Sequence, residues 1–160
     1  MRKKPTPRPL DEFDRAILRI IQQDNKTPQR QIAERVNLSA AAVQRRIAAM
    51  ENAGVISSNT AVVNVHAVQM SITAVVEIRL KDERIETVDN AKNLFRCAPE
   101  VQQCYYVAGG VSFMLIVVVP DMTAYEEITR RLFAQNDSVA SYRSLIALDR
   151  VKTGSTILIP

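Results

Sequence analysis

The chain has 160 residues and a formal charge of +4 at pH 7, with 47% apolar and 24% charged residues. This composition is typical of one or two small globular domains and excludes a disordered tail or a coiled coil. No run approaches the ~20 consecutive apolar positions that a membrane helix needs, so we expect no membrane partner.

Few residues are available for metal or redox chemistry. Cys97 and Cys104 are seven positions apart and form no CxxC motif, and His66 is the only histidine. This pattern indicates neither a metal site nor a redox pair, and we expect no cofactor. The basic N-terminus lacks the apolar segment of a secretion signal, which favours a cytoplasmic location.

The positive charge is concentrated in the first two fifths of the chain. Residues 1–64 hold 11 Lys and Arg against 6 Asp and Glu, whereas residues 65–160 hold 10 against 11. A local positive excess attracts phosphate groups but also serves solubility, and the count alone favours neither. Residues 1–9, with three prolines and four basic side chains, are expected to form a flexible basic arm that either contacts DNA or is disordered.

Three amphipathic helices are predicted in residues 10–64. Asp11 and Thr27 are suited to cap the first two, and Pro28 suits the first position of the second. The helices are expected over about 11–23, 28–36 and 40–53. Helical spacing places one set of apolar side chains in a shared core: Phe13, Ile17, Ile20, Ile21, Ile32, Ala33, Val36, Val43, Ile47 and Met50.

The second and third helices are joined by a very short turn. Asn37 can adopt the left-handed conformation that ends a helix, Leu38 can pack back onto it, and Ser39 can cap the next helix. Gly54 provides a similar stop after the third helix. Residues 28–50 therefore have the length and turn residues of a helix-turn-helix unit.

The period of the apolar residues changes after a linker expected over 65–70. Before it, short strands near 55–56 and 60–63 are predicted to form a small wing or a linker strand. After it, alternation predicts strands, two of them joined by a turn at Gly109-Gly110. The predicted strands are 71–80, 101–108, 111–119 and 139–148, and the predicted helices are about 85–97 and 125–132. The order β-α-β-β-α-β indicates a ferredoxin-like domain over 71–160, so the expected fold class is α+β: a winged helix-turn-helix domain joined to a ferredoxin-like domain.

The predicted strand over 111–119 is apolar on both faces. Two helices can cover only one face of a four-stranded sheet, so something else must cover the other. The simplest candidate is the same sheet of a second subunit, which predicts a homodimer. The tail at 156–159 is expected to add an edge strand.

The third helix combines small residues at its start with long polar residues further along. A helix that enters the major groove needs close approach at its N-terminus and side chains that reach base edges and phosphates. The alternative is that these polar residues form an ordinary solvated face. Arg30 and Arg35 either contact the DNA backbone or increase solubility. The predicted DNA contacts are Ser39, Ala40, Ala41, Gln44, Arg45, Arg46 and Arg35.

These segments together resemble one known family. The run LDEFDRAILRIIQQDNKTPQRQIAERVNLSAAAVQRRIAAMENAGVI is similar to the DNA-binding domain of the Lrp/AsnC, or feast/famine, transcription factors. YYVAGGVSFMLIVVVPDMTAY and YRSLIALDRVKTGSTILIP resemble the strand-turn-strand segment and the C-terminal part of the same family. The resemblance implies a sequence-specific regulator that binds double-stranded, pseudo-palindromic DNA as a homodimer, often assembled into an octamer of four dimers.

The resemblance also implies a small-molecule effector, usually an amino acid, bound between dimers near the glycine turn. Members with such an effector often carry acidic residues where this chain has Gly110 and Ser112. Backbone carbonyls then take over that role, or the effector differs, or none binds. The turn itself is equally typical of a plain hairpin. The candidate effector contacts are Tyr106, Gly109, Gly110, Val111, Ser112, Met114 and Ser144.

Two other functions compete with a sequence-specific regulator. A low-specificity architectural protein would bind random DNA nearly as tightly and with a steep salt dependence. The second competing function is that of an enzyme, because tetrapyrrole-modifying decarboxylases resemble this two-domain plan. The chain has one histidine, no recognisable carboxylate pair and no phosphate-binding glycine loop, so we expect no enzyme and no catalytic residue.

Overall fold

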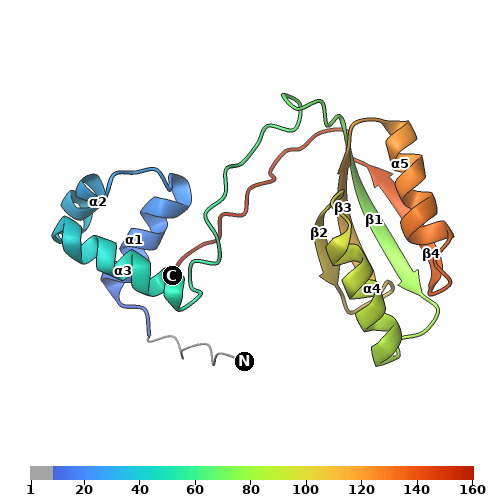
Figure 1. Ribbon diagram of the computed structural model, residues 1–160, viewed down its shortest axis with the longest axis horizontal. Helices are drawn as coiled ribbons and strands as arrows, with labels where there is room; N and C mark the ends of the chain where they lie inside the picture. The colour runs from blue at the N-terminus through green and yellow to red at the C-terminus, as the bar shows by residue number, and fades with distance from the viewer. Residues whose placement is uncertain (1–8) are drawn as a thin grey trace. The chain divides into compact units, whose positions relative to one another are not determined.

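The computed structural model describes residues 9–160, and the predicted basic arm lies almost entirely outside the described residues. The chain forms two compact units, which are described separately (Figure 1). The first runs to Val62 and includes Lys152–Pro160, and the second is Val63–Val151. The change from one to the other falls just before the predicted linker.

The first unit contains the three predicted helices. Asp11 caps the first of them in a capping box with Asp14, whose backbone N–H donates to Asp11 Oδ1 at 2.9 Å. Pro28, not Thr27, is the N-cap of the second helix, which therefore begins one residue later than predicted. The helices are α1 (Glu12–Gln23), α2 (Gln29–Val36) and α3 (Ala40–Asn52).

The turn between α2 and α3 has the predicted conformation. Asn37 is left-handed, with φ 54°, and the Leu38 N–H donates to Ala33 O at 3.0 Å. Ser39 Oγ accepts a hydrogen bond from the Ala42 N–H at 3.2 Å and so caps α3. Gly54 (φ 73°) follows the end of α3 as predicted. The turn residues therefore fix the entry of α3 through short-range contacts alone.

Most of the predicted core of this unit is correct, with Phe13 as the exception, and the predicted wing is not formed by strands. Ile17, Ile32 and Val43 are buried, but Phe13 is 42% exposed, because it lies beside the guanidinium of Arg46 rather than in the core. The short strands predicted near 55–56 and 60–63 are absent from the described residues. A strand requires a hydrogen-bonded neighbour, and this segment instead makes contacts such as that of Asn59 Nδ2 with Glu51 Oε1 at 3.0 Å.

The C-terminal segment does not form the strand expected over 156–159. It does not add an edge strand to the sheet but packs on α1. Gln22 accepts a hydrogen bond from the Ile157 N–H at 2.8 Å and donates one to Ile157 O at 3.0 Å, and Arg19 donates to Ile159 O at 3.2 Å. Ile159 also packs against the core of the first unit. Polar side chains of α1 thus supply the partners that a sheet edge would otherwise provide.

The second unit is an antiparallel sheet with strand order β2-β3-β1-β4, and its two longer helices pack on one face (Figure 1). A π-helical turn, Arg130–Ala134, continues the last helix. The alternating and helical patterns therefore predict this unit correctly, apart from ends that shift by a few residues. Its elements are β1 (Ile72–Leu80), α4 (Ile85–Cys97), β2 (Val101–Tyr106), β3 (Phe113–Val119), α5 (Met122–Thr129) and β4 (Val139–Ile146).

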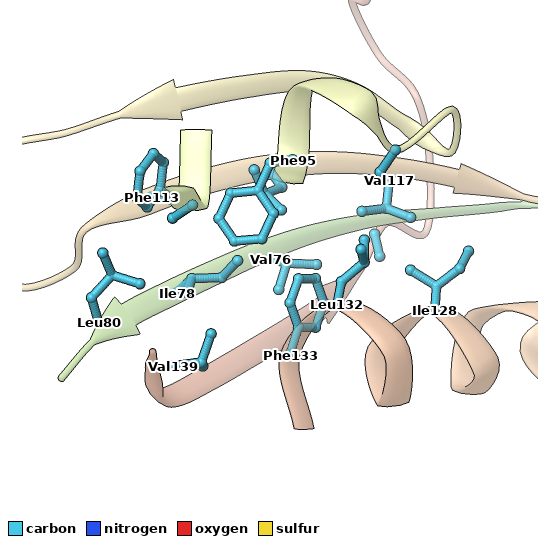
Figure 2. Close-up of a cluster of buried hydrophobic side chains, with 14 of the residues drawn as sticks. Val76, Ile78, Leu80, Phe95, Phe113, Val117, Ile128, Leu132, Phe133 and Val139 are labelled. Carbon is cyan, nitrogen blue, oxygen red and sulfur yellow. The ribbon is translucent and has the colours of Figure 1, made fainter. Parts of the chain in front are cut away.

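Side chains of the helices and of the covered sheet face form one apolar layer (Figure 2). Phe95 of α4 contacts the rings of Phe113 and Phe133 edge to face, at centroid distances of 5.3 and 6.2 Å. Such pairs are favoured by the opposite charges of ring edge and ring face. The helix-covered face is thereby filled from within the unit.

The opposite face of the sheet carries no element of the second unit. Alternation along β3 buries Phe113 and Leu115 beneath the helices and leaves Met114, Ile116 and Val118 half-buried on this open face. Register places Val75, Leu145 and Tyr105 on the same side. The predicted contrast between a covered face and an uncovered apolar face is therefore present.

Candidate functional site

One surface of α3 matches the predicted DNA-contacting face. Ser39, Ala40 and Ala41 are exposed at its N-terminus, and Gln44 and Arg45 are exposed one turn further on. Within the part of the chain that the structure describes, the side chains of Gln44 and Arg45 form no hydrogen bond or ion pair. The face therefore offers small residues for close approach, together with a polar and a cationic side chain that need no partner removed before they bind a ligand.

Arg46 lies differently from its neighbour Arg45. Its Nη1 donates to Asp11 Oδ2 at 2.7 Å and to Asp14 Oδ1 at 2.8 Å, and its guanidinium lies 5.4 Å from the centre of the Phe13 ring. These hydrogen bonds raise the pKa of Arg46 above its ordinary value. Asp14 is fully buried, and Arg46 is a cation that pairs with it there. The structure thus ties Arg46 to α1, which leaves Arg45 as the cation of α3 directed outward.

The two arginines of α2 are both exposed. Arg30 pairs with Glu34 at 3.4 Å, one helical turn away, and 90% of its side chain is exposed. Arg35 lies near the C-terminal end of α2, two residues before the turn. Because an exposed i,i+4 pair contributes only tenths of a kcal/mol, Arg30 can leave Glu34 for a phosphate at little cost. Both arginines are thus able to contact a DNA backbone.

The glycine turn is held by a carboxylate that the sequence analysis missed. Ser112 is buried, and its Oγ accepts from the Leu80 N–H at 3.0 Å and donates to Glu83 Oε1. Tyr106 donates its hydroxyl proton to Glu83 Oε2 at 2.9 Å, and this bond, with partial desolvation, raises the pKa of Tyr106. Glu83 lies in the loop between β1 and α4, and no periodic pattern in the sequence points to it.

The backbone of the turn is restrained from a second side. Arg79 Nη2 donates to Gly110 O. Gly109 has φ 141°, a conformation that favours glycine, and Gly110 follows it. Thus Arg79 brings a cation, and Glu83 an anion, to the same turn.

The predicted effector residues do not all meet within one subunit. Ser144 lies on the helix-covered face, where its Oγ accepts from the Tyr125 hydroxyl, whereas Met114 lies on the open face. The structure brings together Tyr106, Ser112 and the turn, with Val111 between the turn and Ser112. The seven residues do not line one pocket within a single subunit, because alternation places Met114 and Ser144 on opposite faces of the sheet.

The described residues contain no group of three or more His, Cys, Asp or Glu arranged to hold a metal ion. In the same part of the chain, no helix has both the length and the hydropathy needed to cross a membrane.

A helix-turn-helix unit with an exposed polar face on its second helix, joined to an α+β sheet unit, defines a two-domain DNA-binding regulator. A family model of winged helix-turn-helix DNA-binding domains matches residues 10–57, and one of the Lrp/AsnC ligand binding domain matches residues 73–157. The chain belongs to the Lrp/AsnC family of transcriptional regulators.

Individual relatives agree with this assignment. An uncharacterized HTH-type transcriptional regulator of Sinorhizobium fredii is 37% identical over 94% of this chain and 88% of its own length. An AsnC family transcriptional regulator from Agrobacterium tumefaciens superposes with a TM-score of 0.86 at 32% identity, covering 93% of this chain and 97% of that one. A feast or famine regulatory protein from M. tuberculosis, solved with L-methionine, superposes with a TM-score of 0.84 at 31% identity, covering 95% of this chain and 100% of that one.

Proposed function

We propose that α3 is the recognition helix of this regulator. The observation that carries the proposal is the exposed face on which unpaired Gln44 and Arg45 follow two small residues, Ala40 and Ala41. Gln44 is suited to read a base edge, Arg45 to read guanine or bind phosphate, and Ser39 to hold a phosphate at the N-terminus of the helix. Arg35 supplies a backbone contact.

Replacing Gln44 or Arg45 by alanine is expected to weaken operator binding by about tenfold each, since a good base contact contributes roughly 1–3 kcal/mol. An electrophoretic mobility shift with operator DNA measures the loss. Arg130→Ala is the matched control, because it removes one exposed arginine from the second unit. An unchanged shift for both α3 variants would remove the recognition-helix proposal.

The same mobility-shift experiment, repeated with random DNA, distinguishes a specific regulator from an architectural protein. A regulator binds its operator far more tightly than random DNA of the same length, and Gln44→Ala reduces that ratio. An architectural protein binds both nearly equally, and its affinity falls steeply with salt. A regulator of this kind works where the DNA is, which for the bacterial relatives is the cytoplasm.

We also propose that two copies pair through the open sheet face and that the dimers assemble further, up to an octamer. Val75, Ile116 and Val118 form an apolar centre on this face. Beside it, Arg143 forms two hydrogen bonds with Glu77, at 2.7 and 2.8 Å, which lower the pKa of Glu77. Because these charges already satisfy each other, they can enter an interface without an unpaired ion.

The effector that we propose is an amino acid held near the glycine turn. Support comes from the relative solved with L-methionine and from the charges at this turn. Glu83 provides the carboxylate that Gly110 and Ser112 cannot, and an ammonium group prefers such a partner. Arg79 provides a cation for the carboxylate of the ligand.

Glu83→Gln is expected to lower the affinity for the effector at least tenfold while operator binding without effector stays as in the unmodified protein. The change removes the negative charge but keeps the size of the side chain and an oxygen that can accept from Tyr106. A thermal-shift screen of the twenty amino acids identifies the ligand. The shift that this ligand causes is then compared between the unmodified protein and Glu83→Gln. Glu86→Gln, on the exposed first turn of α4, is the control. Equal shifts for the unmodified protein and Glu83→Gln would contradict the role of Glu83.

A further inference from the structure

A separate pocket of about 390 Å³ lies at the other end of β3 from the glycine turn. It is formed by the last residues of β3, the loop before β2 and the face of α5. The seven residues of β3 separate the two places by about 20 Å at the usual strand rise. Its lining combines apolar side chains, among them Val119, Pro120 and Ile128, with three charged ones, Glu100, Glu127 and Arg131.

Glu100 has one carboxylate oxygen in use and one without a partner. Arg131 Nη2 donates to its Oε1 at 2.7 Å. Its Oε2 is buried, and among the buried side-chain polar atoms of residues 9–160 it alone has no hydrogen bond. The backbone is fixed as well, because the Val118 N–H donates to Glu100 O at 3.0 Å. A buried acceptor of this kind is unfavourable unless a donor reaches it.

The opposite wall is an irregular helix. Arg131 belongs to the π-helical turn, in which the Gln135 N–H donates to Arg130 O at 3.0 Å. Such turns inside helices occur often at functional sites. Glu100, Glu127 and Arg131 together carry a charge of −1, so the pocket favours a cation.

We propose that this pocket binds a primary ammonium group carried on a short apolar chain. Glu100 Oε2 accepts a hydrogen bond from the ammonium group, and Glu127 adds a second negative charge. Val119, Pro120 and Ile128 contact the apolar chain. The volume lies at the lower end of the ~300–1,000 Å³ found for small-molecule sites. The site is distinct from the effector site proposed at the glycine turn and does not depend on it.

Two kinds of molecule carry this chemistry: a free apolar amino acid and the corresponding amine. Arg131 retains N–H groups beyond the one that binds Glu100, and these are able to hold the carboxylate of an amino acid. Comparing L-leucine with 3-methylbutylamine, which has the same carbon chain without the carboxylate, distinguishes the two sources.

Isothermal titration of the full chain tests the site. We expect 3-methylbutylamine to bind the unmodified protein, and Glu100→Gln to weaken that binding at least tenfold. Glu86→Gln should bind it as the unmodified protein does. If L-leucine also occupies this pocket, one class of its sites disappears in Glu100→Gln while the class at the glycine turn remains. If L-leucine does not occupy this pocket, the ligand of the pocket is the amine.

Ala124→Leu is a second variant that keeps the ion pair of Glu100 with Arg131. Ala124 lines the pocket, so a larger side chain there should fill it and abolish amine binding. The proposal is overturned if the amine does not bind the unmodified protein, or if both variants bind it with unchanged affinity. Loss of amine binding in Glu83→Gln alone would also overturn it, by moving the ammonium site to the glycine turn.

Discussion

Replacing Arg46 by alanine is expected to lower the free energy of unfolding of the helix-turn-helix unit by about 3 kcal/mol, the size of effect seen when one partner of a buried ion pair is removed. Asp14 is fully buried, and Arg46, with 23% of its side chain exposed, covers it. Without the guanidinium, Asp14 keeps a buried charge with less compensation. The same change removes the contact with Phe13.

Arg45→Ala is the matched control, because it removes the same charge one position earlier in α3 without breaking an ion pair. Urea denaturation followed by circular dichroism should show an early transition for Arg46→Ala and an unchanged one for Arg45→Ala. Operator affinity should fall in Arg45→Ala at constant stability. If Arg46→Ala unfolds like the unmodified protein yet loses operator binding, Arg46 contacts DNA directly.

The contrast between these neighbours shows what the sequence could predict about the site. The position of α3 follows from Asn37, Leu38 and Ser39, which act within a few residues and leave a recognisable pattern. Periodicity likewise predicts which side of α3 is buried. It assigns Arg45 and Arg46 to one solvated group, because both lie outside the apolar stripe.

Only the folded chain separates the two arginines. The partners of Arg46 are 35 and 32 residues away, and the contact of Ser112 with Glu83 spans 29. Polar contacts between distant residues follow no period, so the sequence gives no sign of which carboxylate will meet which donor. The C-terminal segment is a similar case: its apolar residues predict a strand, but the Gln22 side chain and the core of the first unit provide its partners.

These contacts show which of the positive charges in residues 1–64 are already paired within the protein. The positive excess in residues 1–64 includes Arg46, which two aspartates neutralise, and Arg19, which donates to backbone oxygens of the C-terminal segment. The cationic side chains that remain exposed in this unit include Arg35 and Arg45, both on the helix-turn-helix. A count of charges therefore indicates the right domain but overestimates how many of its cations can meet DNA.

Ile116→Glu is expected to convert the protein to a monomer at micromolar concentration. Ile116 lies in the middle of β3 on the open sheet face, directly opposite Val75 of β1. In the proposed dimer, each copy would bury an unpaired carboxylate in an apolar interface, at a cost of about 4 kcal/mol or more, which raises the dissociation constant roughly a thousandfold. Sedimentation velocity measures the change directly.

Leu94→Glu is the control for this experiment, because it places the same acid at a 37% exposed apolar position of α4, on the side of the sheet that the helices cover. It should sediment like the unmodified protein. The folded sheet itself should survive in both variants, since Phe113, Leu115 and Val117 keep their packing beneath the helices. Operator affinity should fall in Ile116→Glu alone, because two linked helix-turn-helix units bind a two-fold site far more tightly than one. A stable monomer of the unmodified protein, or an unchanged oligomer of Ile116→Glu, would show that the open sheet face is not where two copies meet.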